Sequence, residues 1–273
     1  MNDTYIARKL AVLLILLLTF TGCDTVDTGN EEPVAPAVIP EAAFAMNLSS
    51  VDQDESASKQ GDAFSHWFNA AVRASIATHV AYAILHVPVE MTAAVQGVEP
   101  VYNGTAWVWT AETMIEGQRN AIDLRARPNG NAVEWDMKIS GVIEETGQYL
   151  ENFLLYTAVT QTDAQQGTFQ VYFPTESGSQ KVLDGSYNID EATGETLAFD
   201  IPADVEDIGG ASAIFNHNDD YVTLDLMGPE GGNHLIEWDE LTNAGALTAD
   251  DYNNGEKSCW DTDLKNTACE PAS

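Results

Sequence analysis

The sequence predicts an α+β, mainly β fold in which an N-terminal helix packs on a long curved antiparallel sheet, as a half-barrel or a barrel-like meander. Between Phe64 and Val87, apolar residues recur every three or four positions, which is the period of an amphipathic helix. From Tyr102 onwards, apolar and polar residues alternate in short runs. No helical crossover separates these runs, so neighbouring strands should be antiparallel.

The first 23 residues have the order of a secretory signal. Arg8 and Lys9 precede an unbroken apolar run, Leu10–Leu18, and small residues precede Cys23. A basic start, about 7–15 apolar residues and a small-residue cleavage site are typical of a signal peptide. The run is too short to span roughly 30 Å of hydrocarbon as a permanent anchor.

Thr21-Gly22-Cys23 resembles the lipobox of bacterial lipoproteins, although Phe20 stands where that family usually has Leu. The resemblance implies cleavage before Cys23, acylation of this cysteine, and a membrane as a partner through the N-terminal lipid. It places the chain in the cell envelope, on the outer rather than the inner membrane, with the domain facing the periplasm or the exterior. Asp24 is an inner-membrane retention signal in some bacterial groups only. The alternative is an ordinary signal peptide followed by an unrelated cysteine.

We expect three segments along the chain: a lipoprotein signal peptide at 1–22, a lipidated cysteine with a disordered tether at 23–60, and a single helix-plus-sheet domain at 61–273. The tether is predicted because residues 24–60 are polar, have no sustained apolar period and include a Pro-Ala run. Such a linker would hold the domain away from the bilayer.

The chain has three cysteines. If Cys23 carries lipid, Cys259 and Cys269 remain as a disulfide pair in an oxidising compartment. Closing this loop would stabilise the fold by roughly 2–3 kcal/mol in the chain-entropy model. A zinc site is the alternative, but two cysteines at this spacing without a nearby histidine make a poor one.

The formal net charge is −32, and removal of the first 22 residues, which carry a net +1, makes it −33. This charge argues against nucleic acid and anionic lipid head groups as partners. Only 11 Lys and Arg face 43 Asp and Glu, and the acids are scattered rather than gathered in a tail. We therefore predict a halophilic type of surface. The hydrophobic content of 44% is sufficient for a folded core.

The predicted helix carries one formal charge between Ala63 and Val87, which is Arg73. We expect Pro88 to end or kink it, with Glu90 to Gln96 as a short second helix. Its predicted apolar stripe is formed by Phe64, Trp67, Phe68, Ala71, Val72, Ile76, His79, Val80, Ala83, Ile84 and Val87.

The first clear hairpin surrounds Asn129-Gly130, the strongest short hairpin signal. A two-residue turn at this dipeptide would place Leu124 opposite Trp135, Ile122 opposite Met137 and Arg125 opposite Glu134. Seven further strands are predicted at 153–160, 168–173, 181–189, 196–201, 212–217, 221–227 and 234–238. The last two should pair Val222 with Trp238 and Leu224 with Ile236, and residues 244–273 should form a loop.

One helix followed by a long antiparallel meander is similar, in element order only, to the half-barrel of the lipoprotein carrier and receptor (Lol) group. That resemblance implies a curved sheet around a helix-plugged apolar cavity. A closed lipocalin-like barrel and a two-sheet sandwich have the same sequence pattern and stay open as alternatives.

The sequence contains no phosphate-binding Gly-rich loop, Gly-x-Ser-x-Gly elbow, His-Glu-x-x-His or Cys-x-x-Cys. We therefore assign no catalytic residue, no metal site and no cofactor. We read His79 as a hydrogen-bonded core residue, and we find no evident partner for His234. His217, beside Asp219 and Asp220, is read as turn chemistry rather than a cation site. Trp107, Trp109, Trp135 and Trp238 are expected in the core, or else on a concave binding face.

These features favour a non-enzymatic, lipid-anchored envelope protein that binds or scaffolds, with an apolar ligand or an envelope protein as its partner. Two alternatives stay open. One is an envelope hydrolase with an unrecognised Asp/His site, and the other is a structural surface or adhesion component.

Overall fold

A computed structural model describes residues 33–46, 61–115, 117–142, 148–175, 178–190 and 194–269. The chain divides into two compact units, Met1–Val34 and Ala35–Ser273. Cys23 and the predicted signal peptide lie outside the described residues. All of the helices and strands described below belong to the second unit.

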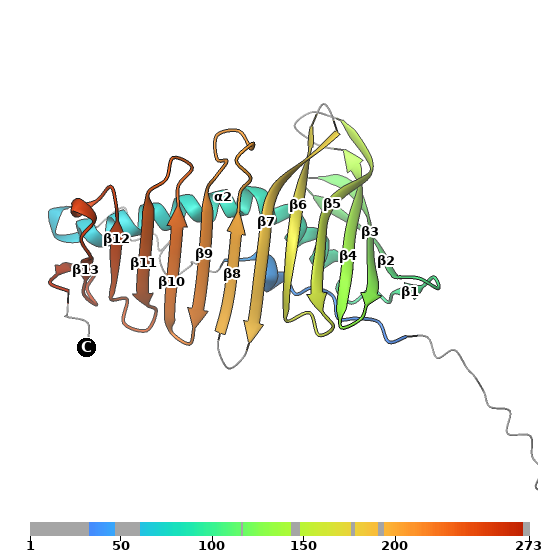
Figure 1. Ribbon diagram of the computed structural model, residues 1–273, viewed down its shortest axis with the longest axis horizontal. Coiled ribbons are helices and arrows are strands. Elements are labelled where there is room, and N and C mark those ends of the chain that lie inside the picture. The colour runs from blue at the N-terminus through green and yellow to red at the C-terminus, as the bar shows by residue number, and fades with distance from the viewer. Residues whose placement is uncertain are drawn as a thin grey trace, which may run out of the picture. The chain divides into compact units, whose positions relative to one another are not determined.

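The second unit is built on one antiparallel sheet whose fourteen strands follow each other in chain order (Figure 1). The first seven strands are β1 (Val101–Tyr102), β2 (Trp107–Ile115), β3 (Gln118–Asn129), β4 (Ala132–Val142), β5 (Tyr149–Gln161), β6 (Gln166–Thr175) and β7 (Gly178–Asp190). The others are β8 (Gly194–Asp200), β9 (Ser212–Asn218), β10 (Tyr221–Met227), β11 (Asn233–Asp239), β12 (Gly245–Ala249), β13 (Ser258–Trp260) and β14 (Asn266–Thr267). The predicted fold class is confirmed. Because the sheet is single and its end strands do not pair with each other, it is neither a closed barrel nor a sandwich.

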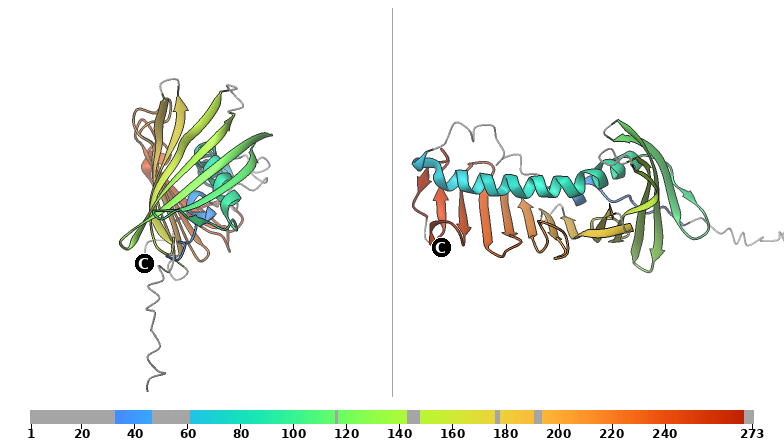
Figure 2. Two further views of the ribbon diagram at one scale, coloured as in Figure 1. Left: turned by 90° about the vertical axis from the view of Figure 1, so that its right-hand side faces the viewer. Right: turned by 90° about the horizontal axis from the view of Figure 1, so that it is seen from above.

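One long helix, α2 (Ser65–Val95), crosses one face of this sheet. Strands β8 to β13 stand side by side along the helix, whereas β2 to β5 curl around its C-terminal end (Figure 2). Accordingly, α2 contacts β12 and β13 as well as β2 and β3. Within the residues that the structure describes there are also three short 3-10 helices: η1 (Glu41–Phe44), η3 (Asp62–Phe64) and η4 (Asn253–Gly255).

The face of α2 that packs on the sheet is rich in alanine. Five of its buried residues are Ala70, Ala71, Ala74, Ala77 and Ala81. Small side chains allow the helix to approach the sheet closely, and the larger Trp67, Ile84, Leu85 and Met91 are buried on the same helix. The predicted stripe is therefore wrong in part, since Val72, Ile76, His79 and Ala83 are exposed.

Two other predictions about the helix also need correction. Pro88 does not end it, and Glu90 to Gln96 is not a separate second helix, because α2 continues to Val95 with Pro88 buried inside it. A proline there loses one backbone hydrogen bond. Burial of Met91 and Val95 inside the curled part of the sheet favours a continuous helix despite that loss.

The hairpin formed by β3 and β4 exists, but its predicted register is wrong by two residues. Leu124 lies opposite Met137, and Arg125 lies opposite Asp136. The turn is Gly130-Asn131, and of these two only Gly130 has a positive φ, +64°. Glycine at the first central position is typical of a type II′ turn, whereas the prediction placed it second, as in type I′. A shift of two residues keeps every side chain on its face, so alternation alone did not distinguish the two registers.

The pairing predicted for β10 and β11 is confirmed: Val222 lies opposite Trp238 and Leu224 opposite Ile236. The C-terminal stretch is not entirely loop, however. Strands β12, β13 and β14 extend the sheet to Thr267. These strands are too short for alternation to reveal them, and they form because the edge of β11 offers a partner.

The predicted tether is shorter than expected, because residues 35–46 belong to the folded unit. Ile39 and Ala43 are fully buried. The ring of Phe44 lies 5.5 Å from that of Tyr156 and 4.9 Å from that of Phe169, measured between centroids. This segment contacts both α2 and β7, so it fills space between helix and sheet with side chains of the chain itself.

Candidate functional site

The candidate site is an apolar groove between α2 and strands β8 to β10. Its volume is about 560 Å³, within the range of small-ligand sites, roughly 300–1,000 Å³. Its apolar walls are formed by Val72, Ile76, Ala77, Val80, Phe199, Ile201, Ile208, Ala211, Ala213, Leu226, Met227 and Pro229. Four polar residues complete its lining: Arg73, Ser212, His234 and Asp251.

One wall of the groove is the loop 201–211, which joins β8 to β9. Backbone hydrogen bonds close this loop on itself, from Ile201 N to Ala211 O and from Gly210 N to Ile201 O, both 2.9 Å. Gly209 is required there, because a Cβ at this position would lie only 2.5 Å from the Val205 carbonyl oxygen. The closed loop presents Ile208 to the groove.

The groove is open to solvent along the helix. Ile76 is 60% exposed and Val72 is 40% exposed. Across from them lies the half-buried Leu226 at the end of β10. These three residues come from the helix and from β10, so the fold gathers them into one apolar patch. Contiguous exposed apolar surface is unusual on a soluble domain and is typical of binding sites.

Arg73 sits at one end of the groove inside a hydrogen-bonded cluster. Its Nη2 donates to both carboxylate oxygens of Asp251, at 2.7 and 2.9 Å. Its Nε donates to His234 Nδ1 at 3.2 Å, and its Nη1 donates to the backbone and side-chain oxygens of Asn69 at 3.0 and 3.1 Å. The Tyr252 ring lies 5.9 Å from the guanidinium carbon. All three guanidinium nitrogens therefore donate to acceptors of the protein itself.

The electrostatics of this cluster follow from its hydrogen bonds. The bond from Arg73, ahead of the opposing effect of desolvation, holds the pKa of Asp251 below its ordinary value. His234 Nδ1, which accepts from Arg73 Nε, also lies 3.5 Å from Asp251 Oδ1, so the imidazole contacts both members of the ion pair. The charges of Arg73 and Asp251 cancel, and the groove has no net charge at this end.

His234 was expected to have no partner, and this expectation is wrong. Its partners were not visible in the sequence because Arg73 is 161 positions away from it. The signal was Arg73 as the one formal charge between Ala63 and Val87, because a cation on a helix that packs against a sheet requires a counter-ion.

The other histidines do not form a site. His79 is exposed rather than in the core, and its Nδ1 pairs with the Ser75 carbonyl oxygen of the same helix at 2.7 Å. His217 Nε2 lies 3.3 Å from Glu240 Oε2, while Asp219 and Asp220 form the turn between β9 and β10. Among the described residues, no three His, Cys, Asp or Glu side chains gather as metal ligands.

The four tryptophans of the predicted strands are core residues, as the first of the two interpretations predicted. Trp107, Trp109, Trp135 and Trp238 are each at most 7% exposed, and none of them lines the groove. Their alternation in the sequence predicted burial correctly.

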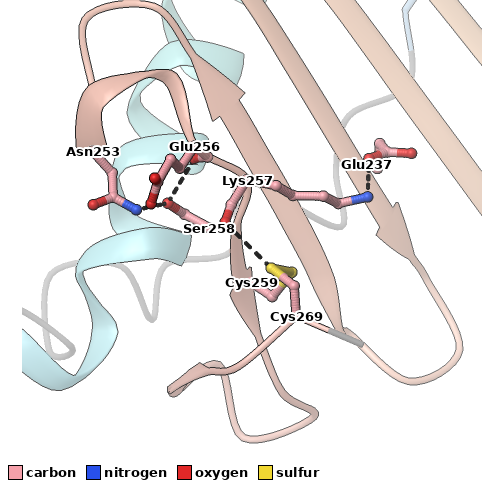
Figure 3. Close-up of a disulfide and its surroundings, with 7 residues drawn as sticks. All are labelled: Glu237, Asn253, Glu256, Lys257, Ser258, Cys259 and Cys269. Atoms are coloured by element: carbon pink, nitrogen blue, oxygen red, sulfur yellow. Dashed lines mark hydrogen bonds and ion pairs between the residues drawn. A yellow bond between two sulfur atoms is a disulfide. The ribbon is translucent and has the colours of Figure 1, made fainter. Parts of the chain in front are cut away.

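Cys259 and Cys269 form the predicted disulfide, with sulfurs 2.04 Å apart (Figure 3). The bridge joins β13 to the chain that follows β14. Beside it, Lys257 Nζ donates to Glu237 on β11 at 2.7 Å. Together these contacts hold the C-terminal strands against the sheet beneath the start of α2, and they assign the cysteines a structural role.

No family model, curated protein or solved structure matches this chain. The candidate site therefore rests on the geometry of the groove and of the Arg73 cluster.

Proposed function

We propose that this chain is a lipid-anchored protein of the bacterial cell envelope that binds an apolar ligand without transforming it. The ligand is a lipid or the acyl chain of a lipoprotein, and it occupies the groove between α2 and strands β8 to β10. The membrane is a partner through the lipid on Cys23. Nucleic acid is not a partner, because the chain is strongly acidic.

The exposed apolar lining of the groove carries this proposal. Fully burying an exposed Val or Ile side chain gains roughly 1.5–3 kcal/mol. Ile76 is 60% exposed and Val72 is 40% exposed, so a ligand that covers them gains part of this free energy. The polar groups at the end of the groove are bonded to each other, so an apolar chain can enter without leaving a charge unpaired.

The groove is tested by changing one of its isoleucines and a matched isoleucine elsewhere. Ile76→Asn places a polar amide in the groove, whereas Ile214→Asn makes the same change on the outer face of β9, where Ile214 is 43% exposed. With the neutral dye N-phenyl-1-naphthylamine as probe, we expect fluorescence enhancement by the natural chain and by Ile214→Asn. We expect about a tenfold weaker binding by Ile76→Asn.

Two results of that titration contradict the proposal. The first is no dye binding by the natural chain, together with no co-purifying lipid in native mass spectrometry. The second is equal loss of binding in both variants, which would show that the dye reports on general surface hydrophobicity.

The anchor is tested separately. In a bacterial host, Cys23→Ser removes the acceptor thiol, so the chain should no longer incorporate radiolabelled palmitate and should leave the detergent phase for the aqueous phase. Cys269→Ser is the control, because it alters a disulfide cysteine and should leave labelling unchanged. Labelling that persists in Cys23→Ser would refute acylation at this residue.

A further inference from the structure

The Arg73 cluster gives the groove a preference among apolar ligands. An arginine at the end of an apolar groove is the arrangement that recognises a fatty-acid carboxylate. Here, however, each guanidinium nitrogen of Arg73 already has a partner in the protein: Nη2 donates to Asp251, Nη1 to Asn69 and Nε to His234. A carboxylate arriving at this end finds a guanidinium that is already bonded on every side.

Asp251 also opposes such a ligand directly. Its side chain is 63% exposed beside the groove, and its pKa is held low by Arg73, so it is ionised at neutral pH. A ligand carboxylate would have to displace this intramolecular, charge-assisted pair while lying next to its negative charge. The overall charge of −32 adds repulsion over a longer range.

We infer that the groove selects neutral apolar ligands, such as long-chain alcohols, esters and acylglycerols, over free fatty acids, and that Asp251 sets this selectivity by neutralising Arg73. The inference rests on the proposed binding function and narrows its ligand class. A neutral chain loses none of the hydrogen bonds in the cluster and meets no net charge at the end of the groove.

The preference is measured with two ligands of equal chain length. Dodecan-1-ol and dodecanoate are used to displace N-phenyl-1-naphthylamine from the full chain at mildly alkaline pH, where dodecanoate is ionised. We expect the natural chain to bind the alcohol at least about tenfold more tightly than the anion.

Asp251→Asn keeps the size of the side chain but leaves the charge of Arg73 without its partner. This variant should bind dodecanoate more tightly than the natural chain does, bringing the ratio of the two affinities to about one. Asp225→Asn is the control, because it removes an equal charge from the exposed outer face of β10. It should keep the ratio of the natural chain.

The outcomes separate the two proposals. Equal affinity of the natural chain for both ligands overturns the selectivity and leaves apolar binding intact. An unchanged ratio in a folded Asp251→Asn overturns the role of Asp251. If neither ligand displaces the dye, or if the dye does not bind and no lipid co-purifies, both proposals fail. Should Asp251→Asn not fold, the comparison of the two ligands on the natural chain still decides the selectivity.

Discussion

At the scale of single residues, polar side chains of α2 are used to fix the helix on the sheet. Arg73 connects the helix to β11 and to Asp251, and its side chain is only 16% exposed. His66, nearer the N-terminus of α2, contacts Tyr252 through Nδ1 at 2.9 Å, and its backbone N–H donates to Asn266 Oδ1 at 3.0 Å. These contacts fix the orientation of the helix, which the small alanine side chains alone would position weakly along the strands.

His66 predicts a pH dependence of stability. Burial lowers the pKa of its imidazole below the ordinary value of 6.5. The unfolded chain therefore takes up a proton before the folded chain does, and stability is lost as pH falls below about 6.5. We expect the melting temperature to fall from pH 7 to pH 5 in the natural chain and to fall less in His66→Gln.

The control for this measurement is His79→Gln, because His79 is exposed on the same helix. It should keep the pH profile of the natural chain. A profile of His66→Gln that matches that of the natural chain would contradict the assignment.

At the scale of elements, the position of α2 on the sheet depends mainly on close packing through its alanine residues. Ala70, Ala71, Ala74, Ala77 and Ala81 are buried with the larger Trp67, Ile84, Leu85 and Met91. Ile76 and Val72 lie on the side of the helix that the sheet does not cover, where they border the groove.

Ala74→Leu tests this packing. Ala74 is 1% exposed, and adding three carbons to a well-packed interface costs typically about 1–3 kcal/mol of unfolding free energy. Ala83→Leu makes the same change on the exposed side of the helix and should alter stability by less than about 0.5 kcal/mol. Urea unfolding measures both. Equal stability of the two variants would mean that α2 does not pack tightly on the sheet.

At the scale of the whole molecule, negative charge dominates. Of the eight Lys and Arg in the described residues, seven lie within ion-pair distance of an acid: Arg73, Arg119, Arg125, Arg127, Lys181, Lys257 and Lys265. Most of these cations therefore neutralise a neighbouring carboxylate. The remaining Asp and Glu side chains, which are in excess, repel one another. Such repulsion destabilises a compact state and is screened by salt.

We therefore expect the melting temperature to rise when sodium chloride is raised from millimolar to molar concentration, with most of the rise at the lower end, where screening changes fastest. Sucrose at equal osmolality is the control, because it stabilises folded proteins without screening charge. A melting temperature that falls with salt, or that rises equally with sucrose, would refute the prediction of a salt-adapted surface.

The sequence by itself determined the helix as far as Val87, the strands β2 to β11, which side of β3, β4, β10 and β11 is buried, and how Cys259 and Cys269 pair. These features are local, or follow from counting. Apolar period, turn residues and an odd cysteine number are properties of the chain before it folds. For the same reason the turn between β10 and β11 was predicted in register.

Only the tertiary structure decided which face of α2 is buried, that Phe44 joins the core, and that Arg73 meets His234 and Asp251. Each of these depends on residues far apart in the chain, such as the 178 positions between Arg73 and Asp251. The helix has apolar residues on several faces, and alternation does not say which of them a sheet will cover. The sheet packs on the face of α2 that carries the alanines, because their small side chains permit a close approach. This position of the helix leaves the groove at its side and brings Arg73 to His234 and Asp251.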